Sequence, residues 1–344
     1  MANLTIVREG VLRFLKWASI IVAFIFVVII LIKIAGGIKK ILFPPGPPRP
    51  AALFGKLENP KFPESINKAK LTYTIGTLSG ELPAFPFLVR INKIEDPPPN
   101  LLALKNFDER FDKLHFGSRK KISENYYRWE NDKEVLREIT MDITSGNFHI
   151  TSSSLNDPTF KPTYPPNPEE ALKVAVEFLD DLAILPEDLD EGKTKTTLLT
   201  IGAGGLIDST SLSKAQLVKV EFFQRSANSL PIVYERGSSP MSLIVGGNNI
   251  PIVIGSNFSH HNILRASSTY PVKTATEALG DLKNGKAYIA SFQGTKGEIS
   301  IQNIYLAYYM TDKRPNYLMP VVVFEGNDGF IAYVSAVRDE WIKN

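Results

Sequence analysis

The sequence predicts an α+β protein, with an N-terminal transmembrane helix, a Pro-rich stalk, and then tandem modules of one helix packed on antiparallel β-meanders. Three observations lead to this prediction. Residues 17–32 contain no charged side chain, and five prolines cluster between residues 44 and 50. The rest of the chain then combines, three times over, one helix-forming segment with several strand-forming segments.

The apolar run near the N-terminus has the composition of a membrane anchor. Residues 20–32 are all apolar, and the candidate anchor residues are Trp17, Phe24, Phe26 and Ile32. The uncharged run is slightly shorter than the ~20 residues that cross a bilayer, but apolar flanks and snorkelling Lys and Arg side chains extend it. A cleaved signal peptide and a buried core helix are the alternatives. We expect residues 1–42 to form a cytoplasmic tail and a transmembrane anchor in the lipid bilayer.

The charges that flank this run do not decide its orientation, because three basic residues precede it and four follow it (Arg8, Arg13 and Lys16; Lys33, Lys39, Lys40 and Arg49). Long domains translocate largely regardless of charge. We therefore expect a single-pass protein of the cell membrane, with its N-terminus inside and the bulk of the chain extracytoplasmic.

The composition excludes several kinds of partner and site. Residues 1–50 hold seven Lys or Arg and one Glu, which leaves 32 basic and 35 acidic residues, net −3, in the remainder of a chain of net charge +3. Nucleic-acid binding needs a basic surface on the folded part, so no nucleic-acid partner is expected. The chain has no Cys, which excludes a disulfide framework and a thiolate metal site.

Residues 43–67 are predicted to form the stalk. Prolines at positions 44, 45, 47, 48 and 50 favour an extended polyproline II conformation. A proline-rich ligand for an SH3-type domain is the alternative interpretation of this segment.

The first module is assigned to residues 68–160, with a helix over 101–115 and a hairpin whose arms are 138–143 and 148–152. The second is assigned to residues 161–265. In it Asn167 is expected to cap a helix that starts at Pro168, and strands follow.

The third module is assigned to residues 266–344. Thr274 and Glu277 have the spacing of a helix capping box, and Gly285 is expected to end that helix. Strands over 288–292 and 299–310 follow, and a hairpin with arms 319–325 and 330–337 ends the chain.

The strands of this last segment carry a family resemblance. Residues 285–289 read GKAYI, 301–309 read IQNIYLAYY, 318–326 read LMPVVVFEG and 330–337 read FIAYVSAV. This pattern resembles the PepSY-like fold. It is most similar to membrane-anchored ectodomain regulators encoded beside the cell-wall sensor kinase of Gram-positive bacteria. The whole layout also resembles uncharacterised anchored proteins of candidate-phyla bacteria. The resemblance implies a non-enzymatic role in which a partner is restrained, and it provides no catalytic residues.

No segment carries a convincing catalytic or cofactor motif. Residues 280–287 imitate a phosphate-binding loop but end in Ala287, where Ser or Thr is needed for Mg²⁺. Residues 202–207 start like a dinucleotide fingerprint but lack its third glycine. His260 and His261 are adjacent, which suits a loop better than a chelate. We therefore expect no catalytic residue, no cofactor and no metal.

Aromatic residues are the candidates for a partner surface. Tyr127, Trp129 and Tyr309 lie in strand-forming segments, where alternation places only half of the side chains in the core. Packing in the core is the alternative for the same residues.

Three functions follow as expectations. The first is a membrane-anchored, non-enzymatic extracytoplasmic protein that regulates or scaffolds a membrane or envelope protein. The second is a module that binds envelope glycan or peptide. The third is an unrecognised envelope hydrolase, which would need a pocket that holds a carboxylate pair or a His–carboxylate contact. The sequence predicts no oligomeric state.

Overall fold

A computed structural model describes residues 16–17, 21, 24–33, 48–65, 71–98, 102–131, 136–157, 160, 162, 167–294 and 297–343. The chain divides into two compact units, residues 1–49 and residues 50–344. Each unit is described by itself below.

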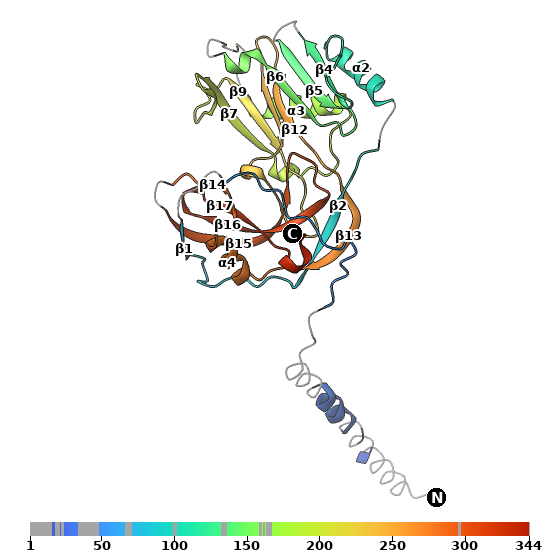
Figure 1. Ribbon diagram of the computed structural model, residues 1–344, viewed down its shortest axis with the longest axis vertical. Coiled ribbons are helices and arrows are strands. Elements are labelled where there is room, and N and C mark those ends of the chain that lie inside the picture. Colours follow the sequence, from blue (N-terminus) through green and yellow to red (C-terminus); the bar gives the residue numbers. More distant parts are fainter. Residues whose placement is uncertain are drawn as a thin grey trace, which may run out of the picture. The chain divides into compact units, whose positions relative to one another are not determined.

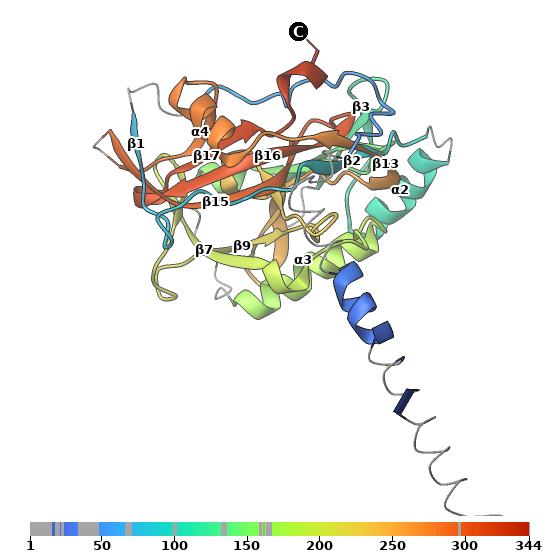
Figure 2. The ribbon, with the colours of Figure 1, turned by 90° about the horizontal axis from the view of Figure 1, so that it is seen from below.

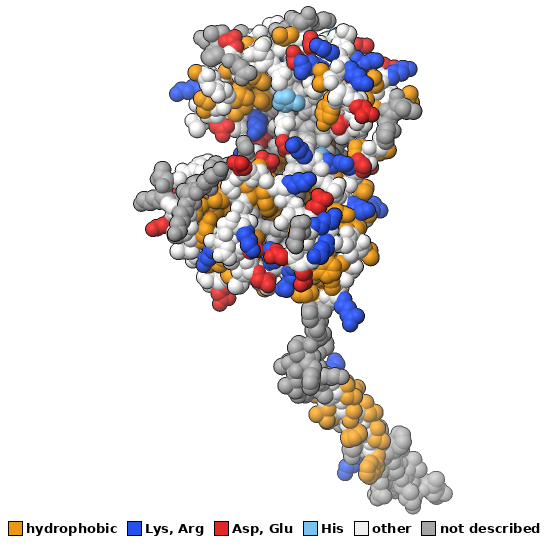
Figure 3. All heavy atoms as spheres, in the orientation of Figure 1, with side chains coloured by type: hydrophobic (Ala, Val, Ile, Leu, Met, Phe, Trp, Pro, Cys, Tyr) orange, Lys and Arg blue, Asp and Glu red, His pale blue; other side chains and the backbone are white. Residues whose placement is uncertain are grey.

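The described part of the first unit is helical over residues 24–33. Trp17, Phe24, Phe26 and Ile32 are each more than half exposed, and this stretch is apolar on the side that Figure 3 shows.

Among the residues that the structure describes, no helix is long and apolar enough to cross a membrane. The predicted single-pass anchor, and the cell-membrane localisation that depended on it, are wrong on this finding. The remainder of the predicted tail and anchor, including residues 1–15 and 34–42, lies outside the described residues.

The middle of the chain forms a nine-stranded sheet within the described part of the second unit (Figure 1). The strand pairs of this sheet are antiparallel throughout its described residues, and sequence neighbours pair in hairpins such as β4–β5 and β5–β6. In spatial order its strands are β3 (Lys120–Lys121), β4 (Tyr126–Asn131), β5 (Arg137–Asp142), β6 (Phe148–Ser152), β12 (Ile252–Phe258), β11 (Met241–Gly246), β9 (Leu217–Phe222), β7 (Lys195–Gly202) and β8 (Gly205–Asp208).

The two ends of this unit together form an eight-stranded sheet. Its long strand β15 pairs antiparallel with β16 and parallel with β1 and β10. The strands are β1 (Thr72–Ile75), β2 (Leu88–Ile94), β10 (Ile232–Tyr234), β13 (Ile263–Pro271), β14 (Tyr288–Ser291), β15 (Glu298–Met310), β16 (Tyr317–Gly326) and β17 (Ile331–Ser335).

These pairings contradict the predicted fold class of α+β tandem modules behind a transmembrane helix. The described chain is mostly β, in two large sheets. Strands β1 and β2, assigned to the first module, pair with β15, β13 and β16 of the third. The local patterns predicted most of these strands, although not β8 or β13, for example. Sequence periodicity carries no information about which distant strands pair.

Three helices of this unit begin and end close to the predicted residues. They are α2 (Ala103–Lys113), α3 (Pro168–Asp181) and α4 (Ala275–Lys283). Asn167 accepts from the backbone amides of Glu169 and Glu170, and Thr274 forms the capping box with Glu277, so both predicted caps are confirmed. Helix α3 packs across β9, β11 and β12, and α4 packs on β17 (Figure 2).

The two sheets share one hydrophobic core. Phe111, on α2, and Leu243, from the nine-stranded sheet, belong to the same buried cluster as Tyr308 and Phe324 from the eight-stranded sheet. A second cluster, on the eight-stranded sheet alone, contains Tyr288, Tyr309 and Tyr333, and Phe62 packs against it.

The segment that precedes the first strand is packed on this unit. Leu57, placed in the predicted stalk, is fully buried and forms a parallel bridge to Ile342. Earlier in the segment, the amide of Phe54 donates to the Tyr270 hydroxyl at 2.9 Å. Residues 51–65 therefore do not stand away from the fold as the stalk prediction required, while residues 43–47 lie outside the described residues.

Candidate functional site

A pocket of about 640 Å³ opens between residues 58–63, which we call the strap, and the turn that joins β15 to β16. Leu57 and Ser65 fix the two ends of the strap: the Leu57 amide donates to the Trp341 carbonyl at 2.8 Å, and the Ser65 hydroxyl accepts from the Ile289 amide at 3.1 Å. The other lining residues are Glu235, Tyr309, Thr311, Asp312, Lys313, Arg314, Pro315, Asn316, Tyr317 and Met319.

Tyr309 lies at the buried wall of this pocket. Its side chain is 3% exposed. Its ring packs edge-on against Phe62, at 5.0 Å between centroids, and in a tilted arrangement against Tyr333, at 5.6 Å. Within the described part of the chain, its buried hydroxyl has no hydrogen-bond partner. A buried polar group without a partner costs roughly 1–3 kcal/mol, so such a group needs a reason.

Other tyrosines of the same sheet have partners for their hydroxyls. Tyr333 donates to the carbonyl of Tyr234 at 3.0 Å, and Tyr305 donates to the Glu325 carboxylate at 2.7 Å. Tyr308, next to Tyr309 but on the opposite face of β15, donates to the carbonyl of Arg90. Among these four tyrosines, Tyr309 is the one whose hydroxyl has no hydrogen-bond partner in the described part of the chain, and it is the one that lines the pocket.

The electrostatic environment of that hydroxyl is negative. Burial raises the pKa of Tyr309 well above its ordinary value, and the carboxylates of Glu235 and Asp312 raise it further. The phenol therefore stays neutral at physiological pH and keeps both its proton and its oxygen lone pairs available for hydrogen bonds.

The turn that carries Asp312 is attached to the loop that leaves the nine-stranded sheet. The Asp312 carbonyl lies 3.0 Å from the ring Nε2 of His261 and accepts from the Ser259 hydroxyl at 2.7 Å. The Asn257 amide lies 3.4 Å from the Asp312 carboxylate. Since these residues span the end of β12 and the loop before β13, the connection between the sheets also positions one wall of the pocket.

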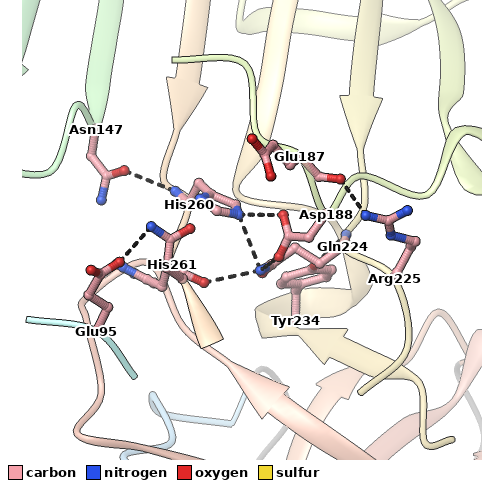
Figure 4. Close-up of polar contacts among 10 residues, drawn as sticks. Glu95, Asn147, Glu187, Asp188, Gln224, Arg225, Tyr234, His260 and His261 are labelled. Atoms are coloured by element: carbon pink, nitrogen blue, oxygen red, sulfur yellow. Dashed lines mark hydrogen bonds and ion pairs between the residues drawn. The ribbon is translucent and has the colours of Figure 1, made fainter. Parts of the chain in front are cut away.

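A polar cluster surrounds the same loop (Figure 4). The ring Nε2 of His260 lies 2.7 Å from Asp188 Oδ1, and the Gln224 amide donates to Asp188 Oδ2 at 2.8 Å and to the His261 carbonyl at 3.1 Å. Because both Gln224 protons are used, the His260–Asp188 contact assigns the proton to His260 Nε2. Asn147 accepts from the His260 backbone amide at 3.0 Å.

Two titratable groups of the cluster are shifted. Burial by itself raises the pKa of Asp188, but the hydrogen bond and charge of His260, with the Gln224 amide, outweigh it and hold that pKa below its ordinary value. Burial lowers the pKa of His261, and this effect exceeds the opposing effect of the Asp312 carbonyl. His261 is therefore neutral at pH 7, and Asp188 is ionised.

The His260–Asp188 contact satisfies only half of the requirement for a hydrolase. Neither residue lines the pocket, and the described partners of the His260 ring are Asp188 and Gln224, which are not nucleophiles. A catalytic histidine needs a nucleophile or a substrate proton within hydrogen-bond reach. The cluster therefore connects the loops of the two sheets, and its geometry assigns it no chemical step.

The structure separates the three aromatic residues proposed for a partner surface. Trp129, on β4, is 1% exposed and stacks on Phe111 at 4.4 Å, so it belongs to the core and is not available to a partner. Tyr127 is half-buried on the same face, 6.3 Å from Trp129 between ring centroids. Tyr309 lies in the other sheet and lines the pocket.

The structure shows what local conformation each of the remaining motifs adopts. Gly285 has φ of 75° directly after α4, which confirms its interpretation as a helix stop. His260 and His261 lie in a loop, as predicted. In the described ranges, no group of three or more His, Asp or Glu side chains is arranged to hold a metal ion. Lys and Arg side chains intermingle with Asp and Glu on the face shown in Figure 3.

Sequence reasoning missed Glu235, Asp312 and the strap. Glu235 and Asp312 are single acidic residues in irregular segments, and the strap lies more than two hundred residues away from both Tyr309 and Tyr317 in the chain. The one available signal was Phe62, a large apolar residue in a segment that a solvated stalk would not require.

Comparison with known proteins adds no family to this geometry: no protein-family model matches the chain, and no curated protein matches it. The resemblance to PepSY-like proteins therefore gains no support from these searches.

Proposed function

We propose that this chain binds a small organic ligand in the pocket between the strap and the β15–β16 turn, and that it acts by binding and not by catalysis. The observation that carries the proposal is the buried, unpartnered hydroxyl of Tyr309 at the wall of a pocket of about 640 Å³. This volume lies within the range of small-molecule sites. Regulation of a partner protein, the first expectation from the sequence, stays a prediction.

The composition of the lining supports the same proposal. Seven of the sixteen lining residues are aromatic or apolar and six are charged, so the pocket combines apolar surface with groups that can fix the orientation of a ligand. The strap and the turn come from distant parts of the chain. The strap is held by the hydrogen bonds of Leu57 and Ser65, and the turn is tied to β2 by the bond from the Ile94 amide to the Asn316 carbonyl at 3.1 Å. A pocket built in this way is largely formed before its ligand arrives, which lowers the entropic cost of binding.

Binding can be tested by thermal unfolding of the full chain with three six-carbon probes of different charge: hexylamine, hexanol and hexanoate. Asn59, an exposed residue of the lining, supplies a variant that fills the pocket, Asn59→Trp. Asn249→Trp, at an exposed turn outside the lining, is the matched control.

The proposal predicts that at least one probe raises the Tm saturably in the unsubstituted chain and in Asn249→Trp, and has no effect in Asn59→Trp. It is overturned if no probe raises the Tm, or if Asn59→Trp responds like the unsubstituted chain. Release of product from p-nitrophenyl hexanoate that depends on Asp188 would instead support the hydrolase.

A further inference from the structure

The charges nearest to the Tyr309 hydroxyl are of one sign. Glu235 and Asp312 both act on it through their negative charge, and Glu235 contributes more. Glu235 is half-buried, on the short turn that follows β10. The Tyr309 hydroxyl is neutral and has no partner among the described residues, and the two carboxylates add negative charge near it, so a donor with a positive charge is the group that suits this end of the pocket.

The rings of the lining favour the same kind of group. Phe62, Tyr309 and Tyr317 all line the pocket. The face of an aromatic ring is electrostatically negative and attracts a cation within about 6 Å of its centroid. Aromatic rings combined with carboxylates are the chemistry that recognises an ammonium ion, whereas a carboxylate or phosphate ligand would be repelled by both.

The basic residues of the lining lie on its solvent side. Lys61 and Lys313 are exposed. Arg314 is also exposed, and its guanidinium is paired with Asp96 at 2.6 Å and lies 3.3 Å from the Glu95 carbonyl. Exposed charges are strongly screened by water, so these three, and Asp312, which is exposed as well, act less on the buried wall than the half-buried Glu235 does.

Access to the Tyr309 hydroxyl depends on Phe62. The hydroxyl is buried, and the half-buried ring of Phe62 packs edge-on against Tyr309. Between its fixed ends at Leu57 and Ser65, the strap contains the local hydrogen bond from the Phe62 amide to the Pro60 carbonyl at 3.0 Å. A rotamer change of one side chain exposes the hydroxyl without moving either end of the strap.

We propose that the ligand of this pocket is an organic ammonium ion, a protonated primary amine that contacts the Tyr309 hydroxyl, the carboxylates of Glu235 and Asp312, and the surrounding rings. This inference rests on the proposed function above, and it specifies the chemical class of the ligand. The alkyl part of the amine lies along Met319 and the rings, which are the apolar part of the lining.

The test is isothermal titration of the full chain at neutral pH with hexylamine, hexanol and hexanoate, which share a six-carbon chain and differ in charge. Hexylamine is expected to bind about tenfold more tightly than either of the others, equivalent to about 1.4 kcal/mol. Glu235→Gln is expected to weaken hexylamine about tenfold and to leave hexanol unchanged. Tyr309→Phe weakens hexylamine to a smaller extent.

Glu325→Gln is the matched control, because Glu325 also lies beside a tyrosine of this sheet, Tyr305 at 2.7 Å, but does not line the pocket. It should bind hexylamine like the unsubstituted chain. Circular dichroism of each variant establishes that it is folded.

Three results overturn the inference, and they differ in what they leave standing. If hexanol or hexanoate binds as well as hexylamine and Asn59→Trp abolishes this binding, the ligand class is wrong while the proposed binding function stands. If none of the three probes binds, both fail. Equal weakening by Glu235→Gln and Glu325→Gln also overturns the inference, since the effect would then not come from the pocket.

Discussion

Trp129 and Tyr309 lie in different sheets and are almost equally buried, at 1% and 3% exposure. Their polar atoms differ. The Trp129 indole nitrogen donates to Asp108 at 3.1 Å, whereas the Tyr309 hydroxyl has no partner among the described residues. Trp129 is surrounded by core, and Tyr309 borders a pocket. The two residues therefore differ in the hydrogen bonding of their polar atoms and not in their burial.

The largest effect is expected when the buried side chain of Trp129 is truncated. Trp129→Ala should destabilise the chain by about 3–5 kcal/mol, because it removes a large fully buried ring and leaves a cavity. Urea denaturation measures this as a fall in the midpoint at unchanged slope. Tyr126→Ala, on the same strand and 47% exposed, is the control and should cost far less. A loss below 1 kcal/mol for Trp129→Ala would contradict its place in the core.

Removal of the Asp108 carboxylate, which accepts the hydrogen bond from the Trp129 indole, tests the comparison more sharply. Asp108→Ala should cost about 1–3 kcal/mol, since the buried indole N–H loses its partner and Arg119 loses its ion pair. Glu109→Ala, the neighbouring residue, should cost under about 0.5 kcal/mol because its pair with Lys105 is exposed. Equal effects of the two substitutions, measured by urea denaturation, would show that the Trp129 hydrogen bond does not stabilise the fold.

A smaller effect is expected from pH, through the loop that supports the pocket wall. Burial lowers the pKa of His261, so its contribution to stability is fully present above its unfolded pKa of about 6.5 and is lost as the pH falls through the lower folded pKa. The Tm should therefore decrease between pH 7.5 and pH 5, and less so in His261→Gln. The same decrease in both proteins would assign the pH dependence to other groups.

The smallest effect is expected at Tyr309. Tyr309→Phe should leave the free energy of unfolding unchanged or raise it by up to about 1 kcal/mol, since it removes a buried hydroxyl that has no partner. The control is Tyr333→Phe, which removes a hydroxyl with a partner at 3.0 Å and should destabilise by about 1 kcal/mol. A Tyr309→Phe variant that is as destabilised as Tyr333→Phe would remove the contrast between Tyr309 and the aromatic residues whose polar atoms are hydrogen-bonded.

Local structure was predictable from the sequence, and the assembly was not. Asn167, Thr274 and Gly285 begin and end helices because caps and turns depend on neighbouring residues. The membrane anchor was inferred from the apolar composition of residues 17–32, but among the described residues no helix is long and apolar enough to cross a membrane.

The pocket could not be predicted from the sequence for the same reason that the predicted fold class was wrong. Tyr309 was a candidate because it is an aromatic residue in a strand, but the strap and Glu235 reach it only through pairings between distant segments. Loop closure over such distances is set by the whole fold, so local patterns could indicate one wall of the site and not the others.

The pairing of the first strands with the last ones also determines when the protein can fold. During synthesis β1 and β2 emerge early, but their partners β13, β15 and β16 are made only after the whole nine-stranded sheet. Until then the early strands have unpaired edges, which are open to association with other chains. A nascent chain that stops before residue 298 has no β15 for β1 to join and lacks the turn that lines the pocket, so the pocket is complete only after most of the chain has been made.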